Sequence, residues 1–102
     1  MKKSTLNYSK KQVFEAAEDA LEELEIEIED SSLKAGIIKA HYGGNMLSFG
    51  NNIEVSIKTT STKKTTIEIE STTWAQLQIV DWGTNDKLEE KIISGIKYFL
   101  NP

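Results

Sequence analysis

The chain has 102 residues with no cysteine, one histidine and twelve basic residues, all of them lysine. That length suits one compact domain, and the composition excludes a disulfide framework, a thiolate metal site, a cysteine nucleophile and any metal site built on two histidines. The net charge of −4 and the lack of arginine, the side chain that recognises phosphate bidentately, argue against nucleic acid as a partner.

The start of the chain lacks the pattern of a targeting segment. Lys2 and Lys3 are followed by polar residues rather than an apolar run, so no secretory signal is predicted. No stretch approaches the roughly 18 apolar residues that a membrane-spanning helix requires, so no transmembrane segment is predicted. We therefore expect a cytoplasmic protein.

The first predicted element is a helix from about Ser9 to Leu24. Ser9 and Gln12 have the spacing of a capping box, in which each side chain binds the backbone N–H of the other residue. Apolar residues then recur at helical spacing, which predicts one buried stripe. These residues are Val13, Ala17, Ala20, Leu21 and Leu24.

An acidic segment overlaps this helix. Nine of the sixteen residues from Glu15 to Asp30 are acidic and none is basic, whereas the rest of the chain has twelve lysines and seven acids. The segment is either a surface for a basic partner or cations, or a solvated face that keeps the protein soluble. The second interpretation is favoured, and in either case the charge is dipolar.

Four strands follow from residues that alternate between apolar and polar. The ranges are 25–29, 37–42, 52–60 and 65–71, and the last two form an antiparallel hairpin through a short turn. Their polar positions predict a wet outer face of mixed charge. That face carries Glu27, Glu29, Lys39, His41, Glu54, Lys58, Glu68 and Glu70. The range 74–80 also alternates, and continues the fourth strand, forms a fifth strand or is an ordered loop.

The last predicted element is a helix whose apolar stripe runs from Leu88 to Phe99. Asn85 is the preferred cap, with Asp86 and Glu89 as a competing capping box. Gly95 inside this helix suggests close approach to the sheet or to the first helix.

Together these elements predict a single α+β domain over residues 1–102, with an ordered core from about 8 to 100. We expect a two-layer sandwich in which an antiparallel sheet of four or five strands has the N- and C-terminal helices packed on one face. The order is α-β-β-β-β-(β)-α.

Several short segments carry a resemblance. They are Gly36-Ile37-Ile38-Lys39-Ala40, Ser48-Phe49-Gly50, Glu70-Ser71 and Asp81-Trp82-Gly83-Thr84-Asn85. In this order, between Tyr8 and Leu100, the chain resembles a family of small uncharacterised bacterial α+β domains that share an Asp-x-Gly-x-Asn motif before the last helix. The resemblance implies the α+β fold and supplies no catalytic residue.

The strongest candidate for a binding surface is the loop from Gly43 to Asn51. Met46, Leu47 and Phe49 either lie exposed there, where they would dock a partner, an apolar ligand or a membrane surface, or fold back to close one end of the core. The second alternative is favoured.

Two tryptophans bracket the range 74–80. Trp74 and Trp82 line a ligand pocket together with Tyr42 and Phe49, or they close the edge of the core, which is the favoured interpretation. Asp81 is more consistent with capping the turn before the last helix than with acid–base chemistry.

No catalytic constellation is recognisable. His41 is a lone imidazole on the outer face without an activated nucleophile, and no phosphate loop, cofactor motif or metal-ligand cluster is present in the sequence. We therefore expect a non-enzymatic binding or protein-interaction module, whose partner contacts the Gly43–Asn51 loop or the outer face, with self-association as one form. The alternative is a small apolar-ligand or lipid-binding domain with a pocket between the helices and the sheet.

Overall fold

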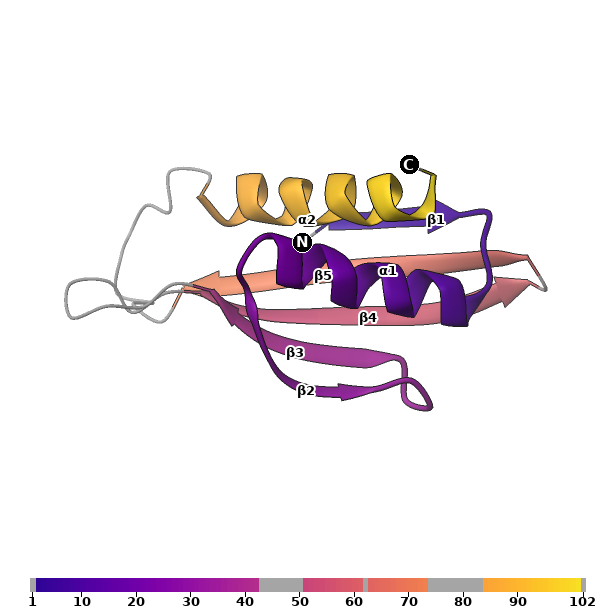
Figure 1. Ribbon diagram of the computed structural model, residues 1–102, viewed down its shortest axis with the longest axis horizontal. Helices are drawn as coiled ribbons and strands as arrows, with labels where there is room; N and C mark the ends of the chain where they lie inside the picture. Colours follow the sequence, from indigo (N-terminus) through magenta and orange to yellow (C-terminus); the bar gives the residue numbers. More distant parts are fainter. Residues whose placement is uncertain (1, 43–50, 62, 74–83, 102) are drawn as a thin grey trace.

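The computed structural model describes residues 2–42, 51–61, 63–73 and 84–101. Seven elements follow one another along these residues: β1 (Lys2–Leu6), α1 (Lys10–Glu23), β2 (Glu27–Ser32), β3 (Ile37–Tyr42), β4 (Asn51–Ser61), β5 (Lys64–Thr73) and α2 (Thr84–Leu100). The strands form one sheet in the order β1-β5-β4-β3-β2, and all neighbouring strands are antiparallel. Both helices lie on the same face of this sheet, as the side view shows (Figure 1). The α+β class and the antiparallel sheet are confirmed.

The N-terminal strand β1 was not predicted. The expected order began with the first helix, and the expected core began at about residue 8. Instead β1 pairs with β5 from Lys2 opposite Ile69 to Leu6 opposite Thr65. Its sequence is polar up to Leu6, which alone is buried, so the hydrophobic pattern was too weak to indicate a strand. The range 74–80 lies outside the described residues.

Helix α1 begins with the capping box that the sequence predicts. The Ser9 side chain accepts a hydrogen bond from the Gln12 backbone N–H at 3.3 Å, and the Gln12 side chain accepts from the Ser9 backbone N–H at 3.1 Å. The apolar stripe then faces the sheet and α2, with Val13, Ala17 and Leu21 fully buried. The helix therefore lies within one residue of its predicted bounds.

The end of α1 explains why β2 begins two residues later than expected. Glu25 has a φ of +60°, and the backbone N–H groups of Glu25 and Ile26 donate to the carbonyls of Glu22 and Leu21. This is a Schellman ending, in which the left-handed position is usually glycine. It turns Ile26 into the core before β2 starts at Glu27.

Two glycines permit close approach of the backbone, one within the sheet and one between the two helices. Gly36 has a φ of +70°, and a Cβ there would overlap the carbonyl oxygen of Ile57, whose N–H donates to the Gly36 carbonyl at 2.7 Å. On α2, a Cβ at Gly95 would lie 3.1 Å from the Ala20 Cβ. The close approach at Gly95 is therefore to α1, one of the two predicted alternatives.

The core lies between the helices and the sheet. Alternating isoleucines and valine of β3, β4 and β5 face α1 and α2 and are almost completely inaccessible to solvent. These strand residues are Ile38, Ile53, Val55, Ile57, Ile67 and Ile69. They belong to one core cluster with the helix residues Val13, Leu21, Ile92 and Ile96. None of the described elements covers the other face of the sheet, which we call the uncovered face (Figure 1).

Candidate functional site

The uncovered face of the sheet carries the polar side chains that the sequence placed there. Strand register makes Lys39, Glu54 and Glu70 one row across β3, β4 and β5, and His41 and Asn52 partners in the next row. On β2 the alternation is broken, because a bulge between Ile28 and Asp30 makes Asp30 the partner of Lys39 and leaves Glu29 as the additional residue.

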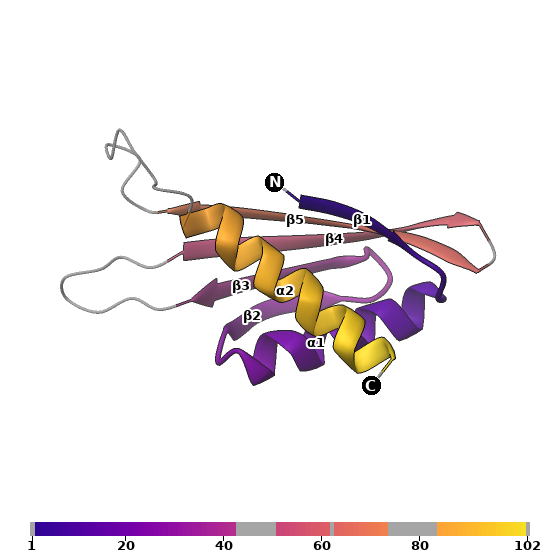
Figure 2. The ribbon, with the colours of Figure 1, turned by 90° about the horizontal axis from the view of Figure 1, so that it is seen from above.

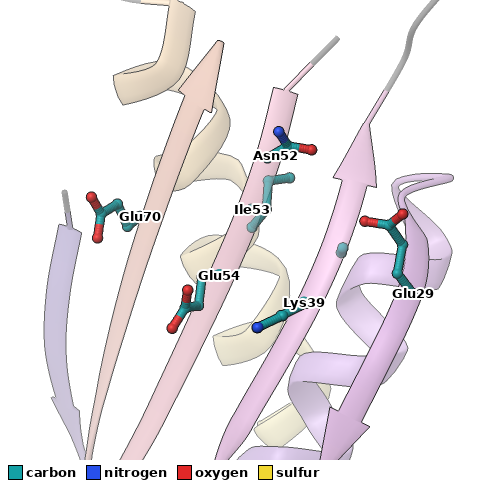
Figure 3. Close-up of a pocket in the computed structure, with 7 residues that line it drawn as sticks. Glu29, Lys39, Asn52, Ile53, Glu54 and Glu70 are labelled. Carbon is teal, nitrogen blue, oxygen red and sulfur yellow. The ribbon is translucent and has the colours of Figure 1, made fainter. Parts of the chain in front are cut away.

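Two like charges lie directly opposite each other in this row. Glu54 of β4 is the register partner of Glu70 of β5, and Lys39 is the partner of Glu54 on the other side. Figure 3 shows the Lys39 ammonium on the side of Glu54, while the Glu70 carboxylate points away from Glu54 toward β1. Directly opposed like charges disfavour a strand pair, and the outward direction of the Glu70 carboxylate separates it from that of Glu54.

A hollow of about 350 Å³ opens at this row. Glu29, Lys39, Glu54 and Glu70 line it from four neighbouring strands, together with Ala40, Asn52 and Ile53. Three carboxylates against one ammonium make it a site of negative potential in which one cationic side chain is already present. The charges favour an additional cationic group over an anion or an apolar ligand.

A second hollow, of about 230 Å³, lies nearer the β4–β5 turn on the same face. Lys3, Lys58 and Glu68 line it with Ser56, Thr60 and Thr66, so its charge balance is the reverse of the first hollow. The uncovered face is therefore acidic toward one end of its strands and carries lysines toward the other.

His41 is engaged by an amide rather than by a carboxylate. Its Nδ1 lies 3.0 Å from Oδ1 of Asn52, its register partner on β4. With an amide oxygen as acceptor, Nδ1 is the donor and the carbonyl of Asn52 orients the ring. This contact ties β3 to β4 through two side chains of the uncovered face.

Most aromatic and apolar candidates from the sequence fall on parts of the chain that the structure does not describe. Met46, Leu47, Phe49, Trp74, Asp81 and Trp82 all lie outside the described residues. Tyr42 is described: it is the last residue of β3 and is 41% exposed. Helix α2 begins at Thr84, so Asn85 lies in its first turn, and the Asn85 side chain is outside the description.

The sequence analysis missed a buried polar contact between α2 and β5. The Glu89 side chain is 1% exposed, and its Oε2 accepts hydrogen bonds from the backbone N and the Oγ of Ser71, each at 2.8 Å. The signal was present, because Glu89 has helical spacing with Ile92 and Ile96 and so falls on the apolar stripe. A carboxylate on such a stripe indicates a buried hydrogen-bonding partner.

Two features are absent from the described part of the chain. None of its helices combines the length and apolar character needed to cross a membrane. Within the same ranges, no three histidine or acidic side chains come together in a group able to hold a metal ion.

The resemblance to small bacterial domains stays a prediction. In a comparison with known proteins, no family model matches this chain and no curated protein matches it.

Proposed function

We propose that the protein is a non-enzymatic interaction module that binds a partner protein through the uncovered face of its sheet. The observation that carries this proposal is the hollow of about 350 Å³ across β2 to β5, which Glu29, Glu54 and Glu70 line together with Lys39. The partner that this chemistry fits presents a lysine or arginine side chain from an extended segment.

The size of the face supports a protein partner. Five strands about 4.8 Å apart span about 20 Å, and the 11 residues of β4 extend about 35 Å. Because β1, β2 and β3 have only five or six residues each, the five strands together cover about 600 Å², which is below the roughly 800 Å² that each partner buries in a standard protein interface and suits a weaker contact.

A solvated antiparallel sheet also has a polar face, so polarity alone does not indicate binding. The distinguishing feature is the Glu54–Glu70 pair, because a face selected only for solubility has no need of two carboxylates in direct register. A partner cation between these strands would relieve their repulsion, and destabilising local arrangements concentrate at functional sites.

The test uses a defined probe, a short extended peptide with alternating threonine and lysine residues, titrated into the isotope-labelled protein. We expect amide chemical shifts to change along β3, β4 and β5 at the row of Glu54. The double variant Glu54→Gln/Glu70→Gln should lose these changes. The control Asp19→Asn/Glu23→Gln removes the same charge from exposed positions of α1 and should retain them. Equal loss in both variants, or shifts that avoid the face, would contradict the proposal.

The alternative is an apolar-ligand or lipid-binding domain. The supporting observation is Tyr42, which is 41% exposed where β3 ends, beyond the buried Ile38 and Ala40 of the same strand. A ligand at that end should shift the tryptophan fluorescence when fatty acids are added, and Tyr42→Ala should weaken the response. A flat titration over a panel of amphiphiles would exclude this alternative.

A further inference from the structure

The two outer strands of the sheet differ in charge. In the order β1-β5-β4-β3-β2, the outer strands are β1 and β2. Strand β1 contributes Lys2 and Lys3, whereas β2 contributes Glu27, Glu29 and Asp30, all three of which are exposed. The view from above shows the two strands on opposite sides of the sheet (Figure 2).

The two helices show the same separation of charge, with lysines on α2 and glutamates on α1. One exposed side of α2 carries Lys87, Lys91, Ser94 and Tyr98, which follow one another at helical spacing. Ser94 and Tyr98 on this side line a cavity together with Leu6 at the end of β1. We call β1 with Lys87, Lys91 and Lys97 of α2 the basic edge. Among the described residues of this region, Glu90 is an exposed acidic residue.

On the other side, α1 extends the acidity of β2. Glu15, Glu18 and Glu22 lie at spacings of three and four residues, and Glu18 Oε2 accepts a hydrogen bond from Ser31 Oγ of β2 at 3.3 Å. This contact shows that the glutamate stripe faces β2. We call β2 with these three glutamates the acidic edge.

We propose that the basic edge of one molecule binds the acidic edge of a second copy of this chain, so that the two sheets and the two helix layers lie edge to edge. Contact between two like edges brings charges of the same sign together, whereas contact between unlike edges brings opposite signs together. The favoured contact is therefore head-to-tail, and it leaves one edge of each outer molecule available for another copy.

Both edges also offer an apolar contact. A cavity of about 480 Å³ lies between the C-terminal half of α2 and the end of β1, lined by Leu6, Tyr8, Tyr98 and Leu100 among others. Tyr98 is 60% exposed beside it, and Leu33, in the turn after β2, is 42% exposed at the opposite edge. Aromatic side chains are enriched in protein interfaces, so the exposed Tyr98 ring is the part of this edge best suited to contact a second copy.

The bulge in β2 limits how far strand pairing contributes. It interrupts the outer strand between Ile28 and Asp30, and bulges of this kind reduce edge-to-edge pairing. Electrostatic attraction between exposed side chains should then dominate, which makes the association weak and dependent on salt.

Sedimentation velocity of the full chain over a range of protein concentrations tests this proposal. At about 10 mM salt, where the Debye length is about 30 Å, the weight-average sedimentation coefficient should rise with protein concentration. At about 1 M salt, where the Debye length is about 3 Å, the protein should return to the monomer. A monomer at every concentration and salt level would overturn the proposal. The charges would then serve to prevent edge-to-edge pairing of the sheets.

Charge reversal separates the two edges. Lys87→Glu/Lys91→Glu reverses the basic edge, and Glu15→Lys/Glu22→Lys reverses the acidic edge, all at exposed positions. Each variant alone should stay monomeric, whereas their equimolar mixture should associate, because the intact acidic edge of one variant can meet the intact basic edge of the other.

The control variant Lys63→Glu/Lys64→Glu makes the same charge change at exposed positions of the β4–β5 turn and should associate like the unmodified chain. A mixture of the two edge variants that stays monomeric, or self-association that persists in both, would overturn the head-to-tail contact. Circular dichroism of each variant confirms that the fold is retained.

Discussion

Glu89 on α2 and Ser71 on β5 form a buried two-donor contact, in which one carboxylate oxygen of Glu89 accepts from both the N–H and the hydroxyl of Ser71 at 2.8 Å. Glu89 lies among Leu88, Ile92 and the isoleucines of the sheet, where an ionisable side chain is rare. Because buried donors that lose their acceptor cost free energy, this contact fixes the position of α2 on the sheet.

Removing the Glu89 carboxylate should therefore destabilise the fold. We expect Glu89→Ala to lower the free energy of unfolding by about 2–4 kcal/mol, because two buried donors lose their acceptor and a cavity forms. Ser71→Ala, which removes only the hydroxyl donor, should lower it by about 1–2 kcal/mol. Urea unfolding measures both, with the exposed Ser94→Ala as control. A Glu89→Ala variant as stable as the unmodified chain would mean that the contact is dispensable.

Hydrophobic alternation predicted the strands that build the core. Ile53, Val55 and Ile57 on β4, and Ile67 and Ile69 on β5, are buried as their spacing indicates. β1 could not be predicted in this way, because four of its five residues are polar and the strand depends on pairing with β5. Sequence patterns detect burial on one face of an element and do not detect a strand held mainly by its neighbour.

The candidate site was predictable only in part. The outward positions of Glu54 and Glu70 follow from alternation, but their direct opposition requires the β4–β5 register, which depends on the geometry of the turn. The bulge that places both Glu29 and Asp30 near Lys39 breaks the period of two and so leaves no signal in the sequence.

The end of α1 offers a stabilising substitution. Glu25 occupies a left-handed position with a φ of +60°, where glycine carries no Cβ penalty. We expect Glu25→Gly to raise the free energy of unfolding by about 0.5–1 kcal/mol in urea unfolding. Glu25→Ala removes the same charge but keeps the Cβ, and should not produce this gain. Equal gains in both variants would assign the effect to charge instead of backbone conformation.

The contact between the helices depends on Gly95. Because a Cβ there would already lie 3.1 Å from the Ala20 Cβ, a larger side chain must push α2 away from α1. We expect Gly95→Leu to lower the free energy of unfolding by about 2–3 kcal/mol despite the higher helix propensity of leucine. The neighbouring Ser94→Leu is exposed and should have little effect. Thermal unfolding of the two variants compares them, and an equal melting temperature would contradict the close contact.

Strand β1 should contribute measurably to stability although its sequence is polar. Leu6 is the buried residue of β1, and Thr65 at the facing end of β5 donates its hydroxyl to the Tyr8 carbonyl at 2.7 Å. We expect Leu6→Ala to lower the free energy of unfolding by about 2–3 kcal/mol. Hydrogen exchange should then accelerate in β1 and in the β5 amides that face it. Unchanged exchange along β5 would show that β1 is not a permanent part of the sheet.

The Glu54–Glu70 pair links stability to the proposed function. Glu70→Lys replaces a like-charged cross-strand pair by an oppositely charged one, and should raise the free energy of unfolding by about 0.3–1 kcal/mol. The same substitution fills the acidic hollow with a second ammonium group, so the threonine–lysine probe peptide should no longer bind.

The control Glu90→Lys changes the net charge by the same amount on α2, next to lysines, and should neither stabilise the fold nor prevent peptide binding. Urea unfolding and the peptide titration, performed on both variants, measure the two effects. Stabilisation without loss of binding would separate the repulsion from the function, because a face that binds through these carboxylates cannot keep its partner after the charge of Glu70 is reversed.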